Sequence, residues 1–233
     1  MRAITARIDH LVIAARSLDD GVQWCEATLG VSPGKGGAHP LMGTHNRLLA
    51  ISSATFPQAY LEIIAVDPSR SSQRAAGQRR WFDLDDSTLQ AGLARHGPRL
   101  VHFVARVPDA AAALQTLASE HAHIERGSLI VAARDSAAGR LEWQITVRDD
   151  GQRLFYGALP TLIQWGAVHP VDAMTDSGVS LTVLAAAHPR ADVLRDALDS
   201  LGLGAMAVSQ GAPNLQATLQ TPGGTVILES KGL

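Results

Sequence analysis

A chain of 233 residues in which 46% are hydrophobic and 18% are charged can bury a substantial core. Its formal net charge of −2, without a visible basic stripe, argues against nucleic acid as a partner. No apolar run reaches the roughly 18 residues of a membrane helix, and the single cysteine excludes an intramolecular disulfide. The first residues lack the basic-then-apolar layout of a signal peptide, so we expect a cytoplasmic protein.

Residues 7–31 predict a strand, a short polar turn and an amphipathic helix. Apolar and polar residues alternate in the first part of this stretch, as they do in a half-buried strand. Ser17 suits the N-cap of the helix, and Gly30 suits its C-cap. Two apolar stretches at residues 39–52 and 59–66 then predict further strands, so the order is strand, helix, strands.

The same order recurs at residues 99–124 and 178–203, and strand candidates separated by turn signals follow each helix. The sequence therefore predicts an α+β fold of repeated βαβββ modules, two paired plus a partial third, forming curved mixed β-sheets around a cleft. The expected units are a first module at 1–66, a loop and connecting helix at 67–97, a second module at 98–168, and a third, degenerate βαβββ-like unit at 178–233.

Four polar residues interrupt the apolar strands of the first two modules at matching places. His10 lies in the first strand of module one and Glu62 in its last, while His102 and Gln164 occupy the corresponding strands of module two. A carboxylate within an apolar run is costly unless it is paired or bound to a metal. If the modules bring all four residues to one cleft, their donor atoms would suit a divalent transition metal, and the two histidines with Glu62 alone would match a non-haem iron site.

Two other stretches contain candidate substrate-binding residues. In GTHNRLL, His45 and Arg47 share one side of a strand and would orient or protonate a substrate if that side faces the cleft; otherwise the stretch is a turn with a surface-facing strand end. In QRRWFDLDD, Arg79 or Arg80 would clamp a carboxylate while Trp81 covers the pocket. The alternative for this second stretch is an anchor for the helix that follows.

The repeat layout and the four polar positions resemble the vicinal-oxygen-chelate superfamily, and the stretches DHLVIAARSLDDGVQWCEATLGV, MGTHNRLLAI and YLEIIAVDP look like its glyoxalase-like branch. The resemblance covers about residues 5–170 well and the third unit loosely. It implies that two modules surround a metal bound by His10, Glu62, His102 and Gln164. Metal-dependent members often have Glu at the fourth position, so Gln164 is a departure that implies weaker binding or three protein ligands.

The resemblance also implies a function, which we state as an expectation. It is a metal-dependent lyase or isomerase acting on a small metabolite that chelates the metal through neighbouring oxygens, with Glu62 as both ligand and base. The metal would be Zn, Ni, Co, Mn or Fe(II). The alternatives are an Fe(II) extradiol-type dioxygenase and a metal-free binding or resistance protein of the same fold. We expect a small-molecule partner, neither nucleic acid nor membrane, and a possible homodimer.

Overall fold

The computed structural model describes residues 4–136 and 139–233. The elements of the first unit are β1 (Arg7–Ala14), α1 (Leu18–Leu29), β2 (Gly34–His39), β3 (Thr44–Ala50) and β4 (Tyr60–Val66). The helix caps are those predicted: Ser17 Oγ accepts a hydrogen bond from Asp20 N at 3.1 Å, and Gly30 ends α1 in the left-handed conformation with a φ of 74°.

A connecting helix, α2 (Ser87–His96), leads into a second unit with the same order of elements. These elements are β5 (Arg99–Arg106), α3 (Ala110–Glu120), β6 (Ser128–Ser136), β7 (Gly139–Val147), the short 3₁₀ turn η1 (Phe155–Gly157) and β8 (Thr161–Trp165). A second 3₁₀ turn then precedes the third unit. Its elements are η2 (Pro170–Ala173), β9 (Ser180–His188), α4 (Ala191–Asp199), β10 (Ala207–Gln210), β11 (Asn214–Thr221) and β12 (Gly224–Glu229).

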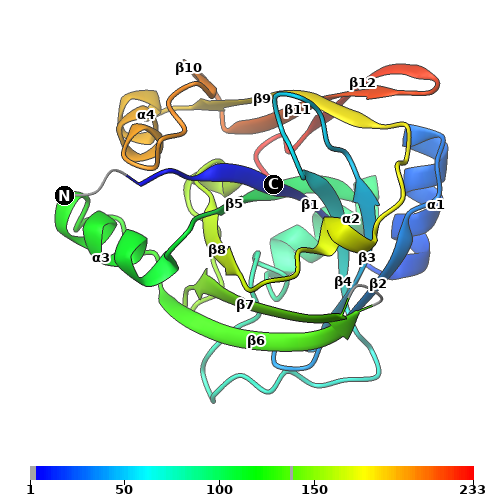
Figure 1. The fold of residues 1–233 in the computed structure, drawn as a ribbon, viewed down its shortest axis with the longest axis horizontal. Coiled ribbons are helices and arrows are strands. Elements are labelled where there is room, and N and C mark those ends of the chain that lie inside the picture. Colours follow the sequence, from blue (N-terminus) through cyan, green and yellow to red (C-terminus); the bar gives the residue numbers. More distant parts are fainter. Residues whose placement is uncertain (1–3, 137–138) are drawn as a thin grey trace.

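The first two units form one curved sheet of eight strands in the order β2-β3-β4-β1-β5-β8-β7-β6. At its centre β1 pairs antiparallel with β5, and each of them has the last strand of its own unit as a parallel neighbour. The sheet curves so far that its two edge strands, β2 and β6, come into contact (Figure 1). This arrangement confirms the predicted α+β class with curved, mixed sheets and repeated modules.

The third unit has the chain order of a βαβββ module but a different sheet. Its four strands run β10-β9-β11-β12, so its first strand lies between the second and third instead of beside the fourth. In Figure 1 this sheet and α4 lie above β1 and β5, whereas β6 and β7 curve below them. The boundaries that the sequence suggested for the units stay a prediction.

The two faces of the eight-stranded sheet bury different apolar clusters. The convex face packs against α1, α3 and the third unit through residues such as Leu11, Leu117 and Leu194. The concave face encloses a second cluster that includes Val12, Ile64, Val104, Ile163, Trp81 and Phe82. Polar side chains that point into the concave face are therefore surrounded by apolar groups, where electrostatic interactions are strong. In the described part of the chain, no helix is both long and apolar enough to cross a membrane.

Candidate active site

A β-bulge in β1 brings two consecutive polar residues to the concave side. The pairing of β1 with β5 shifts between Ile8 and His10, so Asp9 is the extra residue of the bulge. Bulges commonly re-aim a side chain near a functional site. His10 lines a cavity on the concave face, and Asp9 lies fully buried behind it, in contact with Trp165 of β8.

Asp9 is the acceptor at the centre of a buried hydrogen-bond network. Its carboxylate lies 2.7 Å from His10 Nδ1, 3.0 Å from His169 Nε2 and 3.2 Å from Trp165 Nε1. Burial alone would raise the pKa of Asp9, but the hydrogen bonds from His10 and His169 outweigh it and hold the pKa well below its usual range. An ionised Asp9 fixes His10 Nδ1 as a proton donor, which leaves Nε2 as the nitrogen that faces the cavity.

Glu62 of β4 faces that free nitrogen of His10. Glu62 Oε2 lies 3.7 Å from His10 Nε2, and both side chains are buried. Glu62 Oε1 accepts a hydrogen bond of 2.6 Å from Asn46 Nδ2. Because Asn46 holds one carboxylate oxygen, the other is directed to His10, and the two side chains lie side by side at the cavity wall.

Neutral polar groups complete the wall of the cavity. Asn46 Oδ1 accepts a hydrogen bond of 2.8 Å from Gly37 N, and Asn46 Nδ2 also lies 3.4 Å from His39 Nε2. Burial lowers the pKa of His39 to about 4, so His39 is neutral near pH 7. The Tyr60 ring stacks on His10 at 4.6 Å, and burial raises the pKa of Tyr60 well above its usual value.

The cavity itself is small and shares part of its wall with a larger hollow. Its volume is about 30 Å³, which holds one or two water molecules. Trp81 closes one side, stacked on Phe82 at 5.2 Å and edge-on to His39 at 5.1 Å. A hollow of about 700 Å³ shares the lining residues Leu48, Arg134 and Pro170 with the cavity. The bulk of any metabolite would therefore lie in the hollow, with only its reactive end near His10.

The comparisons with known proteins agree with this architecture. The model of the glyoxalase-like domain family matches residues 8–202. The chain belongs to this family. Its fold is that of the vicinal-oxygen-chelate superfamily, as the curved sheet of two paired βαβββ modules indicates. Among curated proteins, none matches the chain.

Several solved structures are similar to this glyoxalase-like protein. A hypothetical protein from Staphylococcus aureus has a TM-score of 0.60 and 15% identity over 97% of this chain and 85% of its own. A variant of methylmalonyl-CoA epimerase from Streptomyces coelicolor, in complex with 2-nitronate-propionyl-CoA, has a TM-score of 0.42 and 19% identity over 72% and 99%. The epimerase from Mycobacterium tuberculosis has a TM-score of 0.40 and 18% identity over 75% and 97%.

Of the four expected metal ligands of this glyoxalase-like chain, the structure brings His10 and Glu62 together. His102 is buried nearby, but both of its ring nitrogens are bonded to the protein. Its Nδ1 lies 3.0 Å from Gly157 O, and its Nε2 accepts a hydrogen bond of 3.1 Å from Thr161 N. Burial lowers the pKa of His102 to about 3, with a further contribution from the charge of Arg153. The lone pair of His102 is thus used within the fold.

Gln164 lies on the opposite face of the sheet from His10 and Glu62. Its strand neighbours Ile163 and Trp165 line the cavity, and because side chains alternate along a strand, Gln164 points to the convex side. There its Oε1 accepts a hydrogen bond of 2.9 Å from Ala110 N, at the start of α3. The arrangement therefore does not fit the four-ligand shell that the resemblance implied. Within residues 4–136 and 139–233, no cluster of three or more His, Cys, Asp or Glu residues could hold a metal ion.

The same alternation decides which residues of β3 reach the cavity. Asn46 and Leu48 line it, so His45 and Arg47 point to the other face. The structure therefore does not bring these two predicted residues to His10 and Glu62. Asn46 lines the cavity in their place, because the side of β3 that carries Asn46 and Leu48 is the one that faces it.

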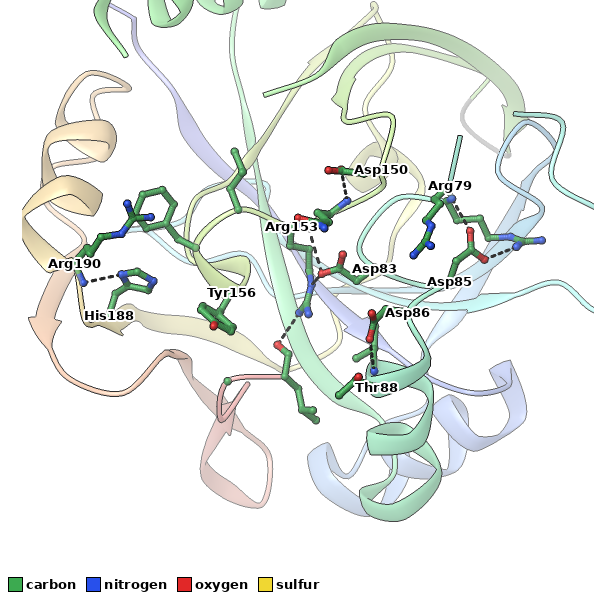
Figure 2. A pocket seen from close by; sticks show the side chains of 17 residues that line it. Arg79, Asp83, Asp85, Asp86, Thr88, Asp150, Arg153, Tyr156, His188 and Arg190 are labelled. Carbon is green, nitrogen blue, oxygen red and sulfur yellow. Dashed lines mark hydrogen bonds and ion pairs between the residues drawn. The ribbon is translucent and has the colours of Figure 1, made fainter. Parts of the chain in front are cut away.

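Arg79 and Arg80 line a different surface groove, which has a volume of about 480 Å³ (Figure 2). Arg80 Nη1 pairs with Asp85 Oδ1 at 2.5 Å, and at the centre of the groove Arg153 Nε pairs with Asp83 Oδ2 at 2.8 Å. The structure does not bring the two arginines to His10. Trp81, the third predicted residue of this segment, does line the cavity.

Several residues of the site were not among those expected. Asp9 and Asn46 are sequence neighbours of candidates that were chosen, and His169 lies between the predicted second module and the third unit. The dipeptide Asp9-His10 within an apolar run was the one usable signal, because two polar residues in succession break the alternation of a strand and suggest a bulge. Arg134, at the mouth of the cavity, had no comparable signal in the sequence.

Proposed function

We propose that this glyoxalase-like protein is an acid–base enzyme of the isomerase or lyase type that acts on a small, oxygen-bearing metabolite. The observation that supports it is the alignment of Asp9, His10 and Glu62, with 2.7 Å between the first two and 3.7 Å between His10 Nε2 and Glu62 Oε2. Pairs of titratable groups held in one water-poor cavity are typical of proton transfer.

Each group has a distinct role in the proposed chemistry. Glu62 Oε2 removes a proton from a substrate carbon next to a carbonyl. The electron pair of the broken C–H bond forms a C=C bond, and the C=O π pair moves onto the carbonyl oxygen. His10, as an imidazolium balanced by the buried Asp9, donates its Nε2 proton in a hydrogen bond to that developing oxyanion. Return of the proton to the same or the neighbouring carbon completes an isomerisation. When the carbon on the other side of the deprotonated one bears a hydroxyl, the electron pair returns from the oxygen and that C–O bond breaks. The hydroxide then leaves as water with the proton held on Glu62, which completes an elimination.

Metal dependence stays a prediction, and it now rests on two of the four expected ligands. His10 Nε2 and Glu62 Oε2 converge on one cavity and would be the two protein ligands of a divalent ion, which polarises bound substrate oxygens when present. The dioxygenase alternative requires His102 as a third ligand, and the hydrogen bonds of His102 give it no support. Cytoplasmic location and homodimer formation also stay predictions.

The experiment is proton exchange measured by NMR in D₂O with a panel of 2-oxo acids and hydroxyketones. We expect wild type to exchange the proton next to a carbonyl, and Glu62→Gln to lose about 100-fold or more of that rate. Glu120→Gln, at the exposed end of α3, is the matched control and should keep it. Adding Zn, Ni, Co, Mn or Fe(II) separately tests the metal. If folded wild type exchanges no substrate with or without any ion, while still binding one, the enzyme proposal fails in favour of a binding protein.

A further inference from the structure

Arg134 lies in the wall that separates the hollow from the cavity of His10 and Glu62. Arg134 belongs to β6, an edge strand of the curved sheet, and lines both the cavity and the hollow. Its positive charge also lowers the pKa of His39 and opposes the rise in the pKa of Tyr60, in keeping with its position beside the site. It is thus the cationic side chain that the cavity and the hollow share.

Space for Arg134 depends on a glycine on the opposite edge of the sheet. A Cβ atom at Gly37 of β2 would lie 2.2 Å from Arg134 Nη1 and 2.9 Å from its Cζ. The guanidinium therefore reaches across the seam between β6 and β2 and lies against the Gly37 backbone. Any residue with a side chain at position 37 would displace the guanidinium from this place.

Arg134 has no competing partner in the part of the chain that the structure describes. It forms no hydrogen bond or ion pair with residues 4–136 or 139–233, whereas Arg140, on the same hairpin, pairs with Glu142 at 3.1 Å and lies near Asp135 at 3.9 Å. A half-buried guanidinium has five N–H donors to satisfy, and their planar fork matches a carboxylate with two parallel bonds.

We propose that Arg134 binds the carboxylate of the substrate, so that the substrate class is a small carboxylic acid such as a 2-oxo or 2-hydroxy acid. This inference rests on the proposed function of His10 and Glu62. An anion approaching the negatively charged Glu62 needs a compensating cation, and Arg134 supplies it at the mouth of the cavity. With the acid group held there, the neighbouring carbonyl carbon is directed toward His10 and Glu62.

The test measures binding apart from turnover. Pyruvate and 2-oxobutyrate are titrated by NMR against Glu62→Gln, alone and combined with Arg134→Gln or Arg134→Lys; pyruvamide is the neutral analogue. We expect Arg134→Gln to weaken binding of the acids by about 10- to 100-fold and to leave pyruvamide unchanged, with Arg134→Lys between. Arg140→Gln removes an exposed cation from the same hairpin and should change the binding of neither the acids nor pyruvamide.

A second variant tests whether the position of the Arg134 charge matters as well as its presence. Gly37→Ala keeps the charge but displaces the guanidinium, so it should weaken the acids in the same direction as Arg134→Gln. Equal binding of acids and pyruvamide by wild type, or acid binding unaffected by Arg134→Gln in a protein with an unchanged Tm, overturns the assignment. If the protein exchanges protons only of neutral hydroxyketones, the acid–base proposal is supported and the role of Arg134 is contradicted. Conversely, acids that bind through Arg134 without any exchange would support Arg134 and contradict the acid–base proposal.

Discussion

Asp9 and His10 are adjacent in the sequence, yet Asp9 Oδ1 lies 2.7 Å from His10 Nδ1 on the concave side of the sheet. In a regular strand their side chains would point to opposite faces, and the bulge in β1 is what brings them together. The contact fixes the tautomer of His10 and supplies the negative charge that an imidazolium needs.

The first prediction concerns this contact. Asp9→Asn keeps the size of the side chain but removes its charge, so we expect a loss of about 10- to 100-fold in kcat. Because Asp9 acts through His10 and does not line the cavity, KM should stay within about twofold of wild type. Steady-state kinetics measures both effects. Asp19→Asn on the exposed face of α1 is the control, and an unchanged kcat in Asp9→Asn would contradict the role given to Asp9.

Local signals in the sequence were sufficient to predict the helices and strands, but they were not sufficient to predict which side chains line the cavity. The alternation of β1, the caps of α1 and the repeated βαβββ order follow from short-range rules, and the structure contains them. Asp9 could not be placed from alternation, because one bulged residue reverses the face of everything before it. The side of β3 that reaches the cavity is set by long-range pairing with β4, so the choice between Asn46 and its neighbours needed the structure.

The third unit shows the same limit on a larger scale. Its chain order matched the other modules, but β9 pairs with β10 and β11 and not with β12. Strand neighbours depend on which apolar faces meet, and the sequence of one strand does not specify its partner. The strands pack on the convex side through Leu184, Leu215 and Leu219, and several strand orders would bury this alternation equally well.

The second prediction is a loss of stability in acid that comes from the buried histidines. The pKa of His39 falls to about 4 and that of His102 to about 3, against an ordinary value of 6.5, in both cases through burial. Between pH 6.5 and about 4 the unfolded chain binds protons that the folded chain does not, so the free energy of unfolding should fall as the pH falls. Asp9 has its pKa lowered as well, and its contribution is lost only at pH values below 3.8.

Urea unfolding at a series of pH values measures this dependence. His39→Gln removes one of the two groups, so the slope of unfolding free energy against pH should become shallower in that window. His123→Gln, which changes an exposed histidine, should leave the slope as it is in wild type. A slope equal in His39→Gln and wild type would show that folding leaves the pKa of His39 unchanged, contrary to this prediction.

The third prediction concerns Arg153, at the centre of the groove in Figure 2. Its Nε donates to Asp83 Oδ2 at 2.8 Å, and its Nη1 donates to Val101 O at 2.7 Å and Leu233 O at 2.9 Å. One buried side chain thus joins the segment before α2, the strand β5 and the C-terminal residue. We expect Arg153→Ala to lower the free energy of unfolding by about 3 kcal/mol. The change leaves two carbonyls without their side-chain donor and leaves Asp83 with only the longer bond from the backbone N of residue 153, at 3.4 Å.

Urea unfolding at pH 7 measures this effect, with Arg140→Ala on the exposed hairpin as the control, for which we expect less than about 0.5 kcal/mol. Arg153→Lys retains the charge but not the fork, and should fall between the two. If Arg153→Ala unfolds like the control, the three contacts contribute nothing beyond what water supplies in their place.

The fourth prediction separates two readings of Gln164. As a metal ligand it would be needed for activity, whereas in the structure its Oε1 accepts from Ala110 N at the start of α3, 2.9 Å away. We therefore expect Gln164→Ala to cost about 1 kcal/mol of stability, as the loss of a helix cap does, and to leave kcat within about twofold of wild type. Asp109→Ala, which removes the side chain that caps Ala112 N of the same helix, is the matched control for the stability effect. A Gln164→Ala protein of near-normal stability that loses activity, and whose activity an added divalent ion restores, would return Gln164 to the metal site and require β8 to turn its other face toward His10.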